Sequence, residues 1–165
     1  MPLYSTKYFG DIDLNNANEF YEADLKLRGQ HFEAVINIIG TKPINKESIQ
    51  SIERYLDDLH DHEAEIKQLL REDFKKEGVV YEYIDLQVEN LNKANISKLI
   101  EGIKLKLNKK EKLFSVVHLL TINFYPDEDD PMFAMHDFTI NKDLTDDLLA
   151  VKLYKDNTVR IDIES

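Results

Sequence analysis

The sequence predicts an α+β fold: a mainly antiparallel sheet built from N-terminal and C-terminal strands, with a helical central segment packed on one face. Two observations predict it. Apolar residues alternate with polar ones, or form β-rich runs, near both ends of the chain, whereas in the middle they recur every three or four residues. No repeat, low-complexity tract or Pro/Gly-rich linker divides the 165 residues, so we expect one domain over residues 1–165.

The N-terminal part contains three strand-like runs, Tyr8–Asp13, Phe20–Arg28 and His31–Ile39. In the second run polar and apolar residues alternate, which is typical of a strand with one face in water. Gly29 and Gln30 separate the second run from the third, and glycine tolerates a positive φ. We therefore expect a hairpin with a two-residue turn at this position.

A helical pattern follows Pro43, with Asn45 as the expected N-cap and Gly78 as the expected residue after the C-terminus. Its apolar stripe lapses between Leu59 and Ile66, so a break or a second helix is expected there. The stripe consists of Ile49, Ile52, Leu56, Leu59, Ile66, Leu69 and Leu70.

In the middle of the chain the apolar pattern distinguishes less clearly between helix and strand. Residues 79–91 fit a strand by composition and a helix by spacing, and both alternatives stay open. Asn95–Leu107 predicts a helix whose lysines, Lys98, Lys104 and Lys106, lie toward solvent.

The C-terminal part predicts an antiparallel set of strands. An apolar run from Leu113 to Tyr125 ends at Pro126, and the last turn is expected at Asp156 and Asn157. The remaining strands are expected at Phe133–Ile140, Leu148–Tyr154 and Val159–Ile163.

Charge and composition exclude several classes of function. The formal net charge is −11, from 32 acidic and 21 basic residues, and a polyanion surface repels nucleic acid, so we expect no direct nucleic-acid binding. The chain has no cysteine, which excludes disulfides and thiolate chemistry. No apolar run approaches the roughly 18 residues of a membrane span, and we expect a cytoplasmic protein that does not enter membranes.

The acidic excess is concentrated at the end, since residues 113–165 contain eleven acidic and four basic residues. Four consecutive carboxylates, Asp127 to Asp130, lie between Pro126 and Pro131, a spacing that does not match a calcium-binding loop and favours an exposed turn. We expect the acidic turns to contact a basic partner. The predicted partner-binding residues are Asp127, Glu128, Asp129, Asp130, Asp143, Asp146 and Asp147.

Two other groups of residues are candidates for chemistry. The segment His60–Glu63 contains metal-ligand types, but His60 and His62 lie about 200° apart on a helix, so a solvated face is favoured over a metal site. His118 or His136, with carboxylates such as Asp137, would suit a small hydrolase or ligand-binding protein. No nucleophile elbow, phosphate loop or other catalytic motif is present, so the sequence assigns no catalytic residue, cofactor or metal.

Four short motifs in residues 124–165, FYP, HDFTI, LTDDLLAVKL and the terminal IES, carry a family resemblance. They resemble the C-terminal part of the bacterial domain-of-unknown-function family 2004. The resemblance implies a bacterial, cytoplasmic α+β protein without an assigned activity, so it brings no catalytic residues with it.

Three functions follow as hypotheses. The leading one is a protein-interaction module whose acidic face binds a basic partner, in the manner of an immunity protein that places carboxylates where a toxin binds phosphates. The second is the small hydrolase or ligand-binding protein that uses His118 or His136. The third is a structural homodimer that pairs through the helical region Asn45–Glu77.

Overall fold

The computed structural model describes residues 3–104 and 106–165 of the chain. Its strands are β1 (Leu3–Ser5), β2 (Asp11–Asp13), β3 (Phe20–Leu27), β4 (Gln30–Asn37), β5 (His118–Phe124), β6 (Met132–Thr139), β7 (Leu148–Tyr154) and β8 (Val159–Glu164). Its helices are α1 (Lys46–Asp57), α2 (Leu59–Lys75), α3 (Val79–Asn90), α4 (Lys93–Ile100) and α5 (Lys109–Ser115).

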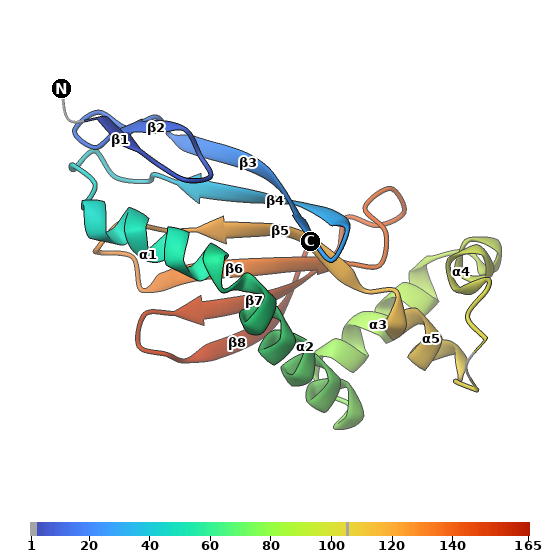
Figure 1. Ribbon diagram of the computed structural model, residues 1–165. Coiled ribbons are helices and arrows are strands. Elements are labelled where there is room, and N and C mark those ends of the chain that lie inside the picture. Colours follow the sequence, from blue (N-terminus) through green and yellow to red (C-terminus); the bar gives the residue numbers. More distant parts are fainter. Residues whose placement is uncertain (1–2, 105) are drawn as a thin grey trace.

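Six strands form the main sheet in the order β3-β4-β5-β6-β7-β8, and β1 and β2 form a separate two-stranded sheet. All neighbouring strands of the main sheet are antiparallel except β4 and β5, which are parallel. Figure 1 shows α1 and α2 crossing one face of this sheet, while α3, α4 and α5 lie together beyond one of its ends. The predicted α+β fold with a mainly antiparallel sheet is confirmed.

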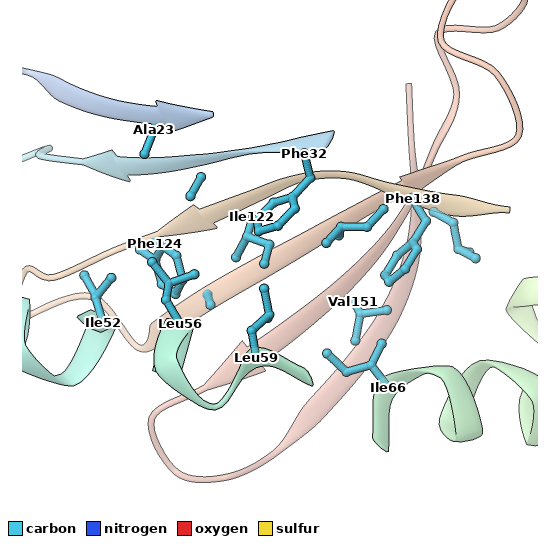
Figure 2. Close-up of a cluster of buried hydrophobic side chains, with 14 of the residues drawn as sticks. Ala23, Phe32, Ile52, Leu56, Leu59, Ile66, Ile122, Phe124, Phe138 and Val151 are labelled. Atoms are coloured by element: carbon cyan, nitrogen blue, oxygen red, sulfur yellow. The ribbon is translucent and has the colours of Figure 1, made fainter. Parts of the chain in front are cut away.

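The core lies between the sheet and the two helices that cross it (Figure 2). Strand pairing brings Ala34, Ile122 and His136 into one row on the helix-covered face. The apolar stripe of the helices packs against this face, and each buried leucine or isoleucine contributes about 1.5–3 kcal/mol. The buried residues of the stripe are Ile49, Ile52, Leu56, Leu59, Ile66 and Leu70.

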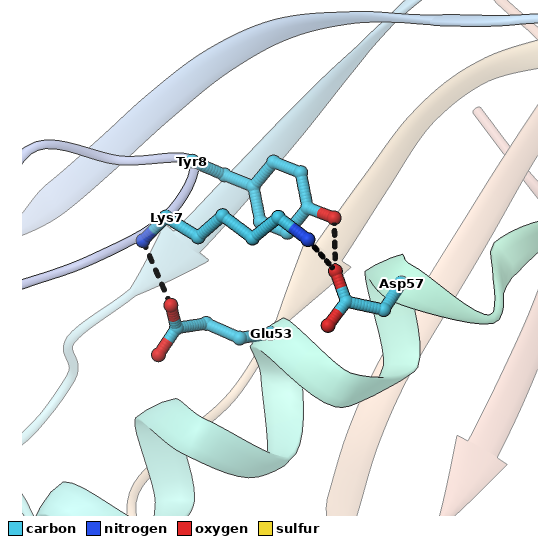
Figure 3. Close-up of polar contacts among 4 residues, drawn as sticks. All are labelled: Lys7, Tyr8, Glu53 and Asp57. Atoms are coloured by element: carbon cyan, nitrogen blue, oxygen red, sulfur yellow. Dashed lines mark hydrogen bonds and ion pairs between the residues drawn. The ribbon is translucent and has the colours of Figure 1, made fainter.

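The N-terminal segment is fastened to α1 by polar contacts (Figure 3). The ammonium of Lys7 lies 2.6 Å from a carboxylate oxygen of Asp57, and the backbone N–H of Lys7 donates to Glu53 over 2.7 Å. The hydroxyl of Tyr8 also donates to Asp57. Because the chain bends here to reach α1, the predicted strand Tyr8–Asp13 is wrong over its first half, and only β2 is extended.

The β3–β4 hairpin turns one residue earlier than predicted. Leu27 pairs with Gln30, so the two turn residues are Arg28 and Gly29 rather than Gly29 and Gln30. Their φ angles are 51° and 80°, and two successive positive values are the mark of the turn that matches the twist of a hairpin. The Arg28 guanidinium also lies 3.2 Å from the ring of His60, which joins the hairpin to α2.

The predicted helical region is divided into two helices. Asn45 caps α1 as expected, because its side chain accepts a hydrogen bond from the backbone N–H of Glu47. The break lies at Asp58, just before the stretch in which the apolar stripe lapses. At the end of α2 the left-handed residue is Glu77, with a φ of 56°, so the role predicted for Gly78 is wrong.

Gly78 instead permits a close approach by Asp73. The Asp73 carboxylate accepts from the backbone N–H of Val80 over 2.6 Å and so caps the start of α3. A Cβ on Gly78 would lie 2.5 Å from that carboxylate, closer than non-bonded atoms allow. The constraint at Gly78 is therefore one of space rather than of a positive φ, since its φ is −84°, and an added methyl group has to displace the Asp73 side chain.

The undecided segment 79–91 is helical. Residues Val80, Tyr83, Ile84 and Gln87 are buried at the spacing of one helix face. The predicted helix Asn95–Leu107 is shorter than expected, because α4 ends at Ile100. Two residues later Gly102 takes a φ of 84°, which a continuing helix does not allow.

The C-terminal strands agree closely with the prediction, and β7 has the predicted bounds. The apolar run that begins at Leu113 is the exception, since Leu113–Ser115 belongs to α5 and only β5 is a strand. Asn108 begins that helix by accepting from the backbone N–H of Glu111. The apolar residues Leu113 and Phe114 therefore pack as part of a helix and not as part of a strand. The last turn is at Asp156 and Asn157 as predicted, with a φ of 68° at Asn157.

Substitution of Gly78 by alanine is expected to lower the free energy of unfolding by about 1–2 kcal/mol, the usual value of a lost N-terminal cap. The added methyl group displaces the Asp73 carboxylate that caps α3. Urea denaturation of G78A, D73A and the double variant measures the coupling. In the D73A background the cost of G78A should disappear, whereas equal costs in both backgrounds would show that the two residues do not interact.

Candidate functional site

The loop Pro126–Pro131, between β5 and β6, is fastened to the chain on both sides. One carboxylate oxygen of Asp127 accepts from the backbone N–H groups of Ile39 and Gly40, over 3.0 and 3.3 Å. The ammonium of Lys155 donates to the backbone carbonyl of Asp127. Asp127 thus joins the end of β5 to the segment that follows β4.

The three other carboxylates of the loop are also held by defined donors. Glu128 accepts from the side-chain amide of Asn45 over 2.9 Å, and Asp129 lies 3.0 Å from the ammonium of Lys42. Asp130 accepts from the backbone N–H of Met132 over 2.9 Å. Each of these contacts engages one carboxylate oxygen, and the side chains of the Asp129–Lys42 pair are at least 80% exposed.

A cleft of 770 Å³ lies between this loop and residues 39–45. Four carboxylates and one lysine line it, so its charge is strongly negative. Ile39, at its rim, is 71% exposed, although it is a large apolar side chain. A second hollow of 630 Å³ continues from Glu128–Pro131 to the β7–β8 turn. We call the surface formed by residues 39–45 and 126–131 the acidic cleft.

The other three predicted partner-binding residues lie elsewhere. The acidic cleft follows β5 and precedes β6, whereas Asp143, Asp146 and Asp147 follow β6, at the opposite end of the sheet. Asp143 and Asp146 are exposed. Asp147 is half-buried and accepts from the side-chain amide of Gln87 over 3.2 Å, which fastens α3 to the sheet. The seven residues therefore form two separate groups, and only the first surrounds a cleft.

The structure does not bring His136 and Asp137 together, because neighbouring residues of β6 project to opposite faces of the sheet. His136 is fully buried under α1, where its ring lies 2.7 Å from the hydroxyl of Tyr55. Burial disfavours the charged ring and lowers the pKa of His136 to about 3. This histidine is a neutral core residue and not a base beside Asp137.

Asp137 lies on the face of the sheet that α1 and α2 leave uncovered. It is 4% exposed, and one carboxylate oxygen accepts from the Thr121 hydroxyl and the Asn123 amide, over 2.9 and 3.0 Å. Burial raises the pKa of Asp137. In the strand register it shares a row with Asp24, Glu33 and Asp162, and Asp162 is paired with Lys152 and Arg160.

The remaining histidines serve other contacts. His62 stacks on Tyr55 with 4.1 Å between ring centroids, and His60 faces Arg28. Within residues 3–104 and 106–165, no three or more His, Asp or Glu side chains are grouped as a metal site would need. His118 lies in a small pocket with Glu63 and Lys67, rather than beside Asp137.

Sequence reasoning found the four carboxylates of the cleft but missed the residues that hold them, Lys42, Asn45 and the Ile39–Gly40 backbone. These lie more than 80 residues away in the chain. It also favoured a solvated face for the segment His60–Glu63, which is wrong for Glu63, because that side chain is only 4% exposed. The local sequence signal that does mark the acidic loop is the pair of prolines at its two ends, Pro126 and Pro131.

None of the protein-family models, curated proteins or solved structures compared with this chain matches it. The resemblance of residues 124–165 to domain-of-unknown-function family 2004 therefore stays a prediction. Across the part of the chain that the structure describes, none of the helices has the length and apolar character needed to cross a membrane.

The free energy of unfolding should fall at acid pH because His136 is buried as a neutral ring. Its pKa is lowered to about 3, so between about pH 6.5 and pH 3 the unfolded chain takes up a proton that the native protein does not. The free energy of unfolding should then decrease by about 1.4 kcal/mol per pH unit through this residue. We expect H136Q, which can still bond Tyr55 but does not titrate, to lose less stability than the wild type in urea denaturation between pH 7 and pH 4.

The matched control is Y55F, which removes the hydrogen bond between Tyr55 and His136 but leaves the imidazole of His136 in place. Y55F should lose stability with falling pH as the wild type does. If H136Q and the wild type lose stability at the same rate below pH 6.5, His136 is not buried as a neutral ring.

Proposed function

We propose that the chain is a protein-interaction module that binds a basic partner protein through the acidic cleft. One observation carries the proposal: four carboxylates surround a 770 Å³ hollow and are held there by donors of the protein itself. Binding groups that are already ordered lose little conformational freedom on association. A lysine or arginine of the partner can therefore pair with carboxylates that are in place.

The shape and charge of the cleft support a partner segment with both cationic and apolar side chains. Ile39 offers an exposed apolar contact beside the carboxylates. Arginine suits this surface best, because its planar fork can bond two carboxylate oxygens while its stem packs on apolar groups. The net charge of −11 would also raise the rate at which a basic protein meets this surface.

In its most specific form the proposal is an immunity-type role in the cytoplasm. The carboxylates of the cleft would then cover the cationic site at which a toxic partner binds the phosphates of its substrate. The negative charge of the cleft and its concave shape support this form. The hypothesis of a homodimer through Asn45–Glu77 has less support, because the apolar stripe of α1 and α2 is already buried against the sheet of the same chain.

The proposal predicts a difference between two matched double variants. E128Q/D129N removes two charges from the cleft, and D143N/D146N removes two exposed charges from the opposite end of the sheet. We expect a short peptide of arginine and leucine to bind E128Q/D129N roughly three- to tenfold more weakly than the wild type, and D143N/D146N with unchanged affinity. Calorimetric titration at low and high salt measures both.

Amide chemical shifts recorded during the same titration locate the peptide. Shifts at residues 39–45 and 126–131 are expected, and the affinity should fall as salt increases. Equal weakening of both double variants would show that only overall charge matters. Shifts elsewhere, or affinity that is indifferent to salt, would contradict the proposed site.

A further inference from the structure

A second, smaller pocket lies at the other end of the β4–β5 pair, between the β3–β4 hairpin, α2 and the segment that enters β5. Its volume is 350 Å³, near the lower end of the range for small-molecule sites. Polar and charged side chains from all three elements meet in it. The lining residues are Leu27, Gln30, Phe32, Glu63, Lys67, Ser115, Val116, Val117, His118 and Leu119.

Glu63 is the unusual member of this pocket. It is 4% exposed, and one of its carboxylate oxygens, Oε1, lies 3.1 Å from the ammonium of Lys67. Its other oxygen, Oε2, is buried and has no hydrogen-bond partner among the described residues. Leaving a buried charged acceptor without a donor is costly. A ligand that supplies a donor at this point would gain the hydrogen bond that the protein leaves unmade.

His118 offers a second acceptor. Its Nδ1 lies 3.0 Å from the backbone carbonyl of Val116, and a carbonyl can only accept, so Nδ1 carries the proton. In the neutral ring Nε2 is then an acceptor. Lys67 supplies the opposite function, because an ammonium has three donors and the contact with Glu63 uses one of them.

The combination of charges selects the class of ligand. A simple cation would be repelled by Lys67, and a simple anion would be repelled by Glu63. One carboxylate and one imidazole provide too few ligands for a metal ion. A molecule with an ammonium and a carboxylate close together satisfies both charges, and the apolar wall from Phe32, Val117 and Leu119 leaves room for a short aliphatic group.

We infer that this pocket binds a small zwitterion of the α-amino-acid type, with its ammonium at Glu63 and His118 and its carboxylate at Lys67. This inference is independent of the acidic cleft, because the two sites share no residue. The pocket lies at the starts of β4 and β5, whereas the cleft lies at their ends.

The test is a titration of the full chain with glycine, alanine, serine and valine, followed by amide chemical shifts and by calorimetry. Saturable binding of at least one of them is expected, with shifts at Gln30, Lys67 and His118. Ethylamine and propionate, which each carry only one of the two charges, should bind at least tenfold more weakly. Binding of either at equal strength, or no saturation by any of the four amino acids, would overturn the inference.

Variants distinguish binding in this pocket from nonspecific binding elsewhere on the protein. E63Q keeps the size of the side chain and K67M keeps most of its length, and each should weaken binding about tenfold or more, as expected when a hydrogen bond to a charged group is lost. E65Q and K75M are the matched controls, since both residues are exposed on α2 and neither lines the pocket. Unchanged affinity in folded E63Q and K67M, or equal losses in the controls, would also overturn the inference.

Discussion

The parallel pairing of β4 with β5 is the constraint on which the rest of the fold depends. Antiparallel neighbours are joined by short turns, but parallel neighbours need a long connection that returns to the starting end of the sheet. Here the connection is residues 38–117, and it contains all five helices that the structure describes. The sheet is thus an N-terminal hairpin and a C-terminal four-stranded meander that meet at one parallel seam. Asn37 reinforces the seam by donating to the Asn123 side chain over 3.2 Å.

Both candidate sites follow from this seam. Parallel strands begin at one end of a sheet and finish at the other, so the segments after β4 and β5 meet and form the acidic cleft. The segments that begin the two strands meet at the opposite end, where α2 adds Glu63 and Lys67 to complete the small pocket. The faces of the sheet differ as well: one is covered by α1 and α2, and the other carries the acidic row that includes Asp137. The polar sites thus depend on topology as much as on composition.

The sequence predicts the parts of this structure that depend on local periodicity. Local β-rich patterns located β3, β6, β7 and β8 to within two residues at each end, and the Asn45 cap was correct. Errors occur where a distant contact overrides the local pattern: Tyr8 leaves the strand to reach Asp57, and Gly78 makes room for Asp73. The same limit applies to the sites. The carboxylates of Asp127 to Asp130 are visible as a run, but their donors come from residues 39–45, and no local pattern assigns Glu63 to a pocket with His118.

Cysteine pairing tests the parallel seam most directly, and the chain has no cysteine of its own to interfere. Glu33 pairs with Thr121 and Val35 with Asn123, on the face that α1 and α2 leave uncovered. Neighbouring strands are close enough for a disulfide. We expect E33C/T121C and V35C/N123C each to form an intramolecular disulfide under mild oxidation, whereas the crossed pairs E33C/N123C and V35C/T121C should form it much less. Preferential formation in the crossed pairs would mean that the strands are antiparallel, and would contradict the placement of both sites.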